Sequence, residues 1–215
     1  MIEVKNVSVR FKDELVLDGV SLNFEVGKIY GIQGKNGSGK SVLFKVIAGF
    51  LKPDSGEVIV NREKLYIDKD FPEECGVMIE SPGLIDNMSG FQNLKYLASI
   101  NKRISDGAIR SYMELFDLDP TSKKKVKNYS LGMRQKLGII QAVMEDQRIV
   151  LLDEPMNSLD EKSVDLVRDH LRSIKKDKVL IITSHNREDL EYVCDDIYRL
   201  AGGVFSFSGT EEMTC

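Results

Sequence analysis

The sequence predicts an α/β fold with a mostly parallel sheet, an antiparallel N-terminal β portion and an inserted helical subdomain. Two features of the chain lead to this prediction. Strand-sized apolar segments alternate with amphipathic helical segments over much of the sequence, and such alternation is typical of a parallel sheet. The stretch from about residue 90 to 145 has helical periodicity without a convincing strand, so we expect the insertion to be helical.

The elements follow in order along the chain. Residues 2–11 and 15–26 contain alternating or clustered β-branched and aromatic residues on either side of a short polar segment. This pattern is typical of the two strands of a hairpin. Apolar runs of strand length predict buried strands at 28–32, 76–79, 149–152 and 179–183. Apolar residues at helical spacing predict helices at 41–50, 91–100, 106–116, 131–145 and 161–174.

The chain has 215 residues, which fits one domain, 1–215, with a small insertion. We place the core at 1–80 and 146–215 and the helical subdomain at about 81–145. The net charge of −4 argues against a protein that binds mainly nucleic-acid phosphate, so no nucleic-acid partner is expected. The sequence has neither a membrane-spanning apolar run nor a secretory signal. We therefore expect a cytoplasmic protein whose three cysteines are free thiols.

A glycine-rich segment carries the strongest functional signal. Residues 34–41 fit the pattern G-x-x-x-x-G-K-[ST] between a predicted strand and a predicted helix. Glycines let the backbone turn tightly and direct N–H groups at a polyphosphate, and the start of the following helix adds positive potential. Lys40 can reach the β and γ phosphates, and Ser41 offers a hydroxyl to Mg²⁺. The pattern predicts a P-loop NTPase core that binds a nucleoside triphosphate through these two residues and through Gly34, Asn36, Gly37, Ser38 and Gly39. A plain glycine turn and a dinucleotide-binding turn are weaker alternatives.

Two carboxylates and a histidine follow later strands. Asp153 and Glu154 come directly after strand 149–152, and ligands bind at the carboxyl ends of parallel strands. We expect Asp153 to hold Mg²⁺ and Glu154 to orient and activate the attacking water; two solvated acids are the simpler alternative. His185 follows strand 179–183 and can hydrogen-bond a γ-phosphate, but taken alone a histidine at such a place is more often structural.

In this order, these motifs and the segment 129–135, Tyr-Ser-Leu-Gly-Met-Arg-Gln, resemble the nucleotide-binding domain of ATP-binding cassette (ABC) proteins over essentially the whole chain. The resemblance implies that ATP and Mg²⁺ are bound, with Asp153 at the metal. It also implies that Glu154 is the base, that His185 is the switch histidine, and that Phe11 stacks on the adenine.

Two positions depart from the usual pattern of that family. The signature L-S-G-G-Q becomes Tyr-Ser-Leu-Gly-Met at 129–133, which keeps Ser130 and Gly132. At a helix start, these two residues can still face the γ-phosphate held by a partner cassette, but Ser130 can also be a plain helix cap. Where the family carries a metal-contacting glutamine, this chain has Glu80, and direct or water-mediated contact with the metal are both open. Both departures are similar to those of ABC exporters for bacteriocin immunity and peptide-antibiotic resistance.

The resemblance implies the ATP-hydrolysing subunit of an ABC transporter, an exporter, which acts through a second, identical cassette and a separate multi-spanning membrane subunit. Such a subunit lies on the inner face of the cell membrane. Four apolar residues are candidates for receiving a cytoplasmic helix of the membrane subunit, with a place in the core as an equal alternative: Leu84, Ile85, Met88 and Phe91. A soluble ABC ATPase acting on ribosomes or chromosomes is the second hypothesis. A P-loop kinase, with which Glu154 conflicts, is the third.

Overall fold

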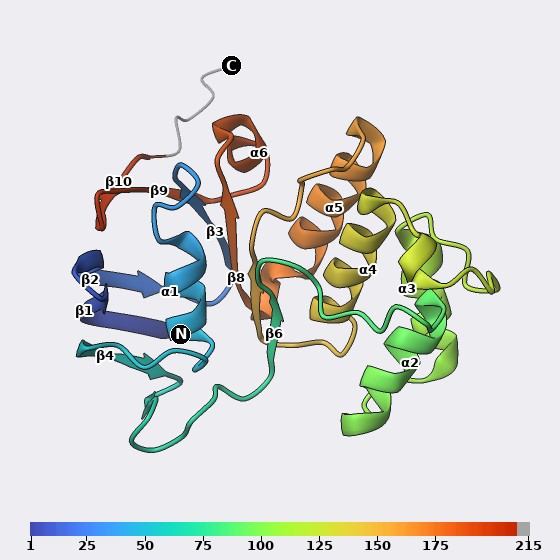
Figure 1. Cartoon of the computed structure of the whole chain (residues 1–215), viewed down its shortest axis with the longest axis horizontal. Coiled ribbons are helices and arrows are strands. Elements are labelled where there is room, and N and C mark those ends of the chain that lie inside the picture. The colour runs from blue at the N-terminus through green and yellow to red at the C-terminus, as the bar shows by residue number, and fades with distance from the viewer. Residues whose placement is uncertain (210–215) are drawn as a thin grey trace.

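The computed structural model describes residues 1–209 and contains two β-sheets with a helix between them (Figure 1). The larger sheet has six strands, of which only β10 runs antiparallel to its neighbour. Its order is β10 (Val204–Phe207), β9 (Asp196–Ala201), β3 (Lys28–Gln33), β8 (Val179–Ser184), β7 (Ile149–Leu152) and β6 (Cys75–Met78). The mostly parallel sheet predicted from the sequence is confirmed, and the four strands expected from apolar runs all belong to it.

The smaller sheet is antiparallel and lies at the N-terminal side of the fold. Its order is β2 (Glu14–Phe24), β1 (Ile2–Phe11), β4 (Ser55–Val60) and β5 (Glu63–Lys64). Strands β1 and β2 form the predicted hairpin, with Phe11 paired to Glu14 across the turn. The sequence does not predict β4, β5, β9 or β10, because these strands mix apolar and polar residues over only a few positions.

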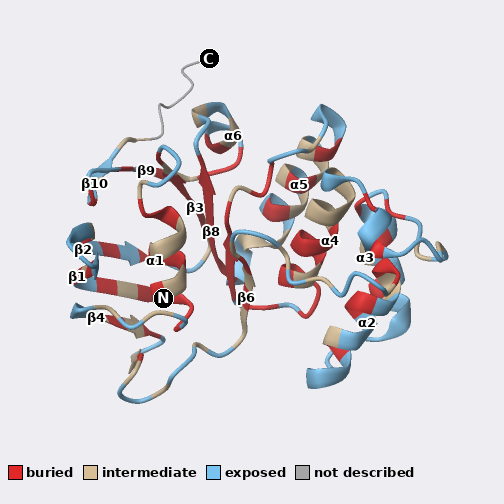
Figure 2. Ribbon diagram, viewed as in Figure 1, coloured by how far each residue is buried: buried red, intermediate tan, exposed pale blue. Residues whose placement is uncertain are grey.

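Two hydrophobic cores lie on the two faces of the larger sheet, and alternate residues of its buried strands belong to one or the other. Ile149 and Leu151 of β7 belong to a core shared with α1 (Lys40–Ile47) and the antiparallel sheet. Val150 and Leu152 of the same strand belong to the core beneath the other helices. Successive strand residues face opposite sides of a sheet, so a strand covered on both faces needs a continuous apolar run. Figure 2 shows this burial along β3 and β8 and on the inner faces of the helices.

The remaining long helices lie on the side of the sheet opposite α1, with α4 and α5 nearer the sheet and α2 and α3 farther out (Figure 1). They are α2 (Gly90–Asn101), α3 (Asp106–Leu115), α4 (Leu131–Val143) and α5 (Glu161–Ile174). Each begins after a residue whose side chain accepts a hydrogen bond from the first turn: Ser89, Ser105, Ser130 and Asp160. A short helix, α6 (Arg187–Glu191), follows β8. Within residues 1–209, no helix combines the length and the apolar character needed to cross a bilayer.

Two predicted helix ends are too late by more than one residue. Helix α1 ends at Ile47 rather than Phe50, because Gly49 has a φ of 79° and the Phe50 N–H donates back to the Lys45 carbonyl at 2.8 Å. A glycine in the left-handed region is a common end of a helix. Helix α4 ends at Val143 rather than Glu145. Its last turn lies against β6, where a Cβ on Gly76 would come within 1.8 Å of the Ala142 carbonyl oxygen.

Two of the three cysteines can be placed. Cys75 and Cys194 are free thiols, as expected, and Cys215 lies outside the described residues. Burial raises the pKa of Cys75 to about 12 and also raises the pKa of Cys194. A thiol with so high a pKa carries almost no thiolate at neutral pH. Neither group is suited to nucleophilic chemistry.

Candidate functional site

The glycine-rich segment forms a compact loop between β3 and α1. Gly37 and Gly39 have φ values of 79° and 103°, in the left-handed region that favours glycine. A Cβ on Gly39 would lie 3.0 Å from the Val16 side chain, and a Cβ on Gly34 would lie 2.4 Å from Ser38 Oγ. At Gly37 the added atom would meet nothing within 4 Å. The loop is therefore tight against its own chain at two glycines and open at the third.

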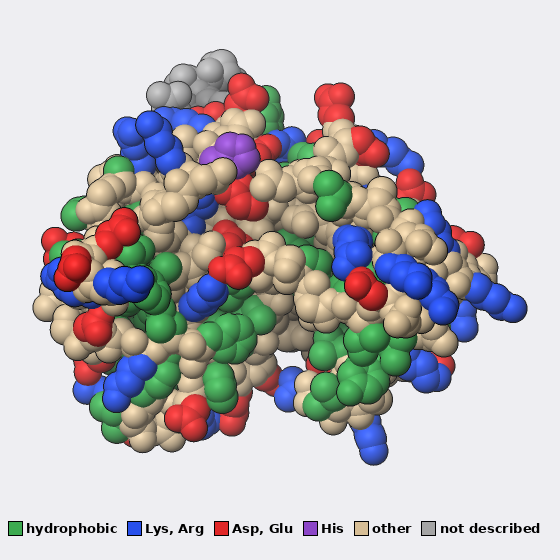
Figure 3. Space-filling model, viewed as in Figure 1, with side chains coloured by type: hydrophobic (Ala, Val, Ile, Leu, Met, Phe, Trp, Pro, Cys, Tyr) green, Lys and Arg blue, Asp and Glu red, His purple; other side chains and the backbone are tan. Residues whose placement is uncertain are grey.

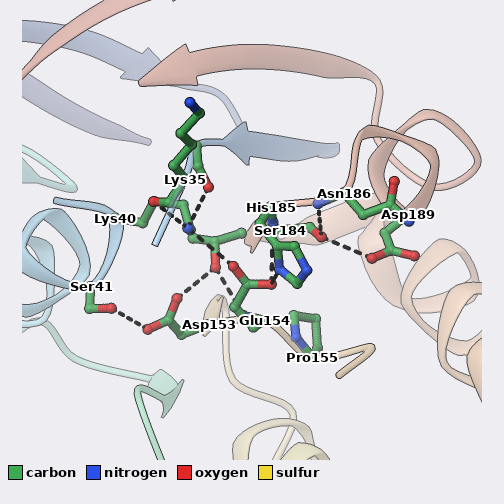
Figure 4. A network of polar contacts seen from close by, with 12 residues as sticks. Lys35, Lys40, Ser41, Asp153, Glu154, Pro155, Ser184, His185, Asn186 and Asp189 are labelled. Atoms are coloured by element: carbon green, nitrogen blue, oxygen red, sulfur yellow. Dashed lines mark hydrogen bonds and ion pairs between the residues drawn. The ribbon is translucent and has the colours of Figure 1, made fainter. Parts of the chain in front are cut away.

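Lys40, the first residue of α1, extends back into this loop and is only 6% exposed. Its Nζ donates to the Gly34 carbonyl at 2.7 Å and to the Lys35 carbonyl at 3.3 Å. The same ammonium lies 3.1 Å from Oε1 of Glu154. A buried cation needs such partners because it has lost its water. The lysine and the carboxylate predicted from distant parts of the sequence thus meet directly (Figure 4).

Asp153 lies at the end of β7 and is buried, with both carboxylate oxygens engaged. Oδ2 accepts a hydrogen bond from Ser41 Oγ at 2.6 Å, and Oδ1 accepts one from Thr183 Oγ1 at 2.6 Å. The predicted pair of metal ligands, Ser41 and Asp153, is therefore brought together. These oxygens form a hard donor set of the kind that Mg²⁺ prefers. Within residues 1–209, no group of three or more His, Cys, Asp or Glu side chains could hold a metal ion. Mg²⁺ commonly keeps waters and phosphate oxygens as its other ligands.

Glu154 lies between Lys40 and His185. Its Oε2 is 2.9 Å from His185 Nδ1 and also accepts the His185 backbone N–H at 3.3 Å. Its backbone has a φ of 50°, in the left-handed region, and its N–H donates to Thr183 Oγ1 at 2.9 Å. A non-glycine residue in that region carries backbone strain, which is frequent at functional sites. Figure 4 shows the lysine and the histidine on either side of this carboxylate.

A cavity of about 340 Å³ opens in front of these groups. Its lining contains most of the predicted nucleotide-binding residues, with two from β2: Glu14, Val16, Asn36, Gly37, Ser38, Gly39, Lys40, Ser41, Val42, Asp153 and Glu154. Gly34 and His185 line a second cavity of about 580 Å³ that shares Ser38 with the first and contains three cations, Lys35, Arg187 and Arg199. The two cavities together offer positive charge and N–H groups to a polyphosphate.

Comparison with known proteins agrees with this geometry. Residues 17–157 match the family model described as ABC transporter. The chain belongs to the ABC transporter family. It is 42% identical over 196 residues to the uncharacterized ABC transporter ATP-binding protein YybJ of Bacillus subtilis (strain 168), covering 91% of this chain and 90% of that protein. It is 30% identical over 198 residues to the lantibiotic transport ATP-binding protein SrtF of Streptococcus pyogenes, covering 92% and 85%.

A solved structure of the ATP-binding cassette MJ0796, a dimer bound to ADP and Pi, has the same fold. The TM-score is 0.84 over 98% of this chain and 99% of that one, with 21% identical residues. As a member of the ABC transporter family, the chain is an ATPase and ATP is its nucleotide. The predicted α/β P-loop NTPase core is confirmed.

The signature residues of this ABC ATPase lie away from its own phosphate loop. Ser130 is exposed and caps α4, because its Oγ accepts the Met133 N–H at 3.2 Å. A Cβ on Gly132 would lie 2.8 Å from the Ser158 carbonyl oxygen, so this glycine permits the close approach of α4 to the loop after Glu154. Neither residue lines the cavity in front of Lys40. Their contact with a nucleotide stays a prediction.

Two other predicted residues are not in contact with the cluster through their side chains. Phe11 is 47% exposed at the end of β1 and does not line the cavity. The Glu80 backbone N–H lies 3.5 Å from Asp153 Oδ2, but the Glu80 carboxylate is paired with Lys45. The contact of Phe11 with adenine and the contact of Glu80 with metal remain predictions.

Sequence reasoning misses two residues that hold Asp153 and Glu154 in place. Thr183 is fully buried at the end of β8 and joins Asp153 to the Glu154 backbone. Gln135 of α4 donates from Nε2 to the carbonyls of Glu154 and Pro155 at 2.8 and 3.1 Å. The available signal for Thr183 was a hydroxyl within an otherwise apolar run, since a buried hydroxyl needs a partner.

Replacing Thr183 with Val is expected to destabilise the protein by about 1–3 kcal/mol and to lower kcat. The isosteric side chain leaves Asp153 Oδ1 and the Glu154 N–H without a partner in a buried site. Urea unfolding measures the stability, and phosphate release from ATP measures kcat. Thr183→Ser keeps the hydroxyl and is expected to retain most of both properties. Equal stability and kcat in Thr183→Val and the parent would contradict this role.

Proposed function

We propose that the chain is the motor subunit of an ABC exporter, that two identical cassettes bind ATP between them, and that hydrolysis drives a separate membrane-spanning subunit. The observation that carries the catalytic part is the row Lys40, Glu154, His185 at the mouth of the phosphate loop, with the Asp153–Ser41 pair beside it. These groups are the ones required to bind a triphosphate, orient water and sense the γ-phosphate.

Lys40 exchanges partners when ATP binds. Its ammonium leaves the Gly34 and Lys35 carbonyls and Glu154 for the β- and γ-phosphate oxygens, while the backbone N–H groups of the glycine loop hold the rest of the polyphosphate. Phe11, exposed on β1, stacks on the adenine. This exchange releases the Glu154 carboxylate to accept a proton from the attacking water.

Ser41 and Asp153 would hold Mg²⁺, with Glu80 as a further candidate ligand. The ion would offset negative charge on the phosphates. Glu154 orients the water, and His185, within 2.9 Å of that carboxylate, donates to the γ-phosphate and reports whether it is present.

The second cassette supplies Ser130 and Gly132. These residues lie at the exposed start of a long helix, α4, where free N–H groups and the helix dipole favour an anion. The γ-phosphate bound to one cassette is that anion for its partner. ATP is thereby held between two chains, and its hydrolysis resets the dimer.

Replacing Ser130 with Ala is expected to weaken ATP-dependent dimer formation by at least about tenfold, because a charge-assisted hydrogen bond to phosphate is lost. Loss of the helix cap alone costs about 1 kcal/mol of stability. Ser105→Ala is the matched control, since Ser105 caps α3 through the Ala108 N–H at the same distance of 3.2 Å. Light scattering in the presence of ATP measures dimer formation, and comparing the two variants separates the loss of a phosphate contact from the loss of a helix cap. Equal association of both variants would show that Ser130 acts only as a cap.

A membrane subunit has a candidate docking surface in the cleft between β6 and the helices. Figure 3 shows the molecule hollowed at its lower edge, with apolar side chains on both sides of the hollow. A cavity of about 470 Å³ there includes Pro72, Leu97 and Asn101. The exposed aromatic and aliphatic residues Phe71 and Ile100 adjoin this lining in sequence. Such exposed apolar groups beside a cleft favour a protein partner.

The four apolar residues expected from the sequence to receive a cytoplasmic helix do not line this cavity, and they differ in exposure. Leu84 and Phe91 are partly buried against the core, which favours the packing alternative for them, whereas Ile85 is 38% exposed. Met88 is partly buried as well. Of the four, Ile85 is the best candidate for contact with a cytoplasmic helix.

The test is to tag the chain in its native cells, solubilise the membranes gently, and identify what co-purifies in stoichiometric amount. A multi-spanning membrane protein is the expected result and places the chain at the inner face of the membrane. The lantibiotic transport role of the relative SrtF makes a peptide-antibiotic exporter the first substrate class to assay. Ribosomes or chromosomal proteins as the stoichiometric partner would overturn the transport proposal in favour of a soluble ABC ATPase.

A further inference from the structure

Glu80 is the one predicted metal-site residue whose side chain points elsewhere. It follows β6, and its backbone lies beside the metal site, because the Glu80 N–H is 3.5 Å from the same Asp153 oxygen that accepts the Ser41 hydroxyl. Its φ of 62° is in the left-handed region. The Glu80 carboxylate instead contacts Lys45, with 2.5 Å between Oε1 and Nζ.

Lys45 comes from the same helix face as the metal-site serine. Ser41 and Lys45 are four residues apart on α1, so their side chains project from neighbouring positions on one side of the helix. Ser41 bonds Asp153 after β7, and Lys45 pairs with Glu80 after the adjacent strand β6. Side chains from one face of α1 therefore contact both the acid after β7, Asp153, and the acid after β6, Glu80. Within residues 1–209, Glu80 is the sole carboxylate within ion-pair distance of Lys45.

The charges at the site are distributed as two lysine–glutamate pairs. Lys40 is paired with Glu154, and Lys45 is paired with Glu80. Asp153 is held by hydroxyl groups, and no lysine in the described part of the chain pairs with it. A glutamine at position 80 would need no such cation, whereas a glutamate adds a negative charge beside Asp153. Lys45 neutralises that charge in this conformation and keeps the carboxylate turned toward α1.

We propose that Lys45 and bound Mg²⁺ compete for the Glu80 carboxylate, so that Lys45 sets the Mg²⁺ concentration at which the ATPase binds its nucleotide. Lys45 is thus a positioning residue that acts through Glu80. The inference rests on the proposed function, in which Ser41 and Asp153 hold the metal. A divalent ion offers the carboxylate twice the charge of the ammonium, and the two cations repel each other, so a metal ion on this carboxylate weakens its pair with Lys45.

The experiment measures ATP binding rather than turnover. Full-length protein with Glu154→Gln, which suppresses hydrolysis, is titrated with MgCl₂ in the presence of a fluorescent N-methylanthraniloyl-ATP. The midpoint in Mg²⁺ is compared for Lys45→Met, Lys45→Arg, Glu80→Gln and the Lys45→Met/Glu80→Gln double variant. Lys52→Met, at an exposed lysine just beyond α1, controls for the general loss of positive charge. Thermal unfolding without nucleotide checks that each variant is folded.

Lys45→Met is expected to lower the Mg²⁺ midpoint by up to about fivefold, the range of a partly exposed ion pair. Glu80→Gln is expected to raise it. In the Glu80→Gln background, Lys45→Met is expected to change the midpoint no more than Lys52→Met does, and Lys45→Arg is expected to behave like the parent. An unchanged Mg²⁺ midpoint in Lys45→Met would overturn the competition. So would a shift of the same size when Lys45→Met is made in the Glu80→Gln background. A parent protein that binds the nucleotide without any dependence on Mg²⁺ would overturn the proposed metal site itself.

Discussion

Replacing Glu154 with Gln is expected to lower the turnover number for ATP hydrolysis by at least about 100-fold. Gln can accept the hydrogen bonds that His185 makes to Oε2, so the loop geometry is retained. It cannot take a proton from the attacking water, because its amide is not a base at neutral pH. It also releases Lys40 from an ion pair, so ATP binding is expected to be unchanged or tighter.

Two measurements and one control separate these effects. Phosphate release gives the turnover number, and size-exclusion chromatography with ATP gives the dimer, which is expected to accumulate because ATP is not consumed. Glu161→Gln removes an exposed carboxylate from the first turn of α5 and is expected to retain parental turnover. Turnover of Glu154→Gln within about threefold of the parent would contradict the assignment of Glu154 as the base.

Replacing Lys40 with Met is expected to weaken ATP binding by at least about 50-fold, because charge-assisted hydrogen bonds to two phosphate groups are lost. The methionine keeps the aliphatic part of the side chain, so the helix start is preserved. Without nucleotide, the Gly34 and Lys35 carbonyls lose their donor and Glu154 loses its cation. We therefore also expect a loss of about 1–3 kcal/mol in stability.

The double variant Lys40→Met/Glu154→Gln distinguishes binding from folding. Removing the unpaired carboxylate is expected to restore part of the lost stability, since one partner of a buried pair left alone is the costly state. ATP binding is expected to stay weak, because neither residue can replace the lysine at the phosphates. Lys52→Met, at an exposed lysine just beyond α1 that lines neither of the two cavities at the phosphate loop, is the control. Parental ATP affinity in Lys40→Met would refute the phosphate role of Lys40.

Several features of the fold and the site can be predicted from contiguous sequence. The phosphate loop is one, because its glycines are required by backbone angles and close contacts within a few residues, as at Gly39. The buried strands are another: β7 needs an apolar residue at each position because both of its faces are covered. Helix starts at Ser89 and Ser130 follow the same local logic, since a cap bonds a backbone group three residues away.

Contacts between segments far apart in the chain cannot be predicted from contiguous sequence. Thr183 joins Asp153 and Glu154, and Lys45 pairs with Glu80, because β6, β7 and β8 are adjacent in the sheet and α1 packs nearby. The sequence identified Glu154 and Lys40 as two functional groups, but not that they form an ion pair in this conformation.

The sequence by itself determined the four apolar strands of the central sheet (β3, β6, β7 and β8), the nucleotide-binding loop, and the chemical identity of the acids and the histidine. Each of these depends on residue type and on spacing along the chain, which set backbone conformation and the face that a side chain occupies. The tertiary structure decided which carboxylate meets which lysine, because strand order and helix placement fix distances between residues far apart in sequence. Lys45 has no special signal in the sequence and becomes the partner of Glu80 only in the folded chain.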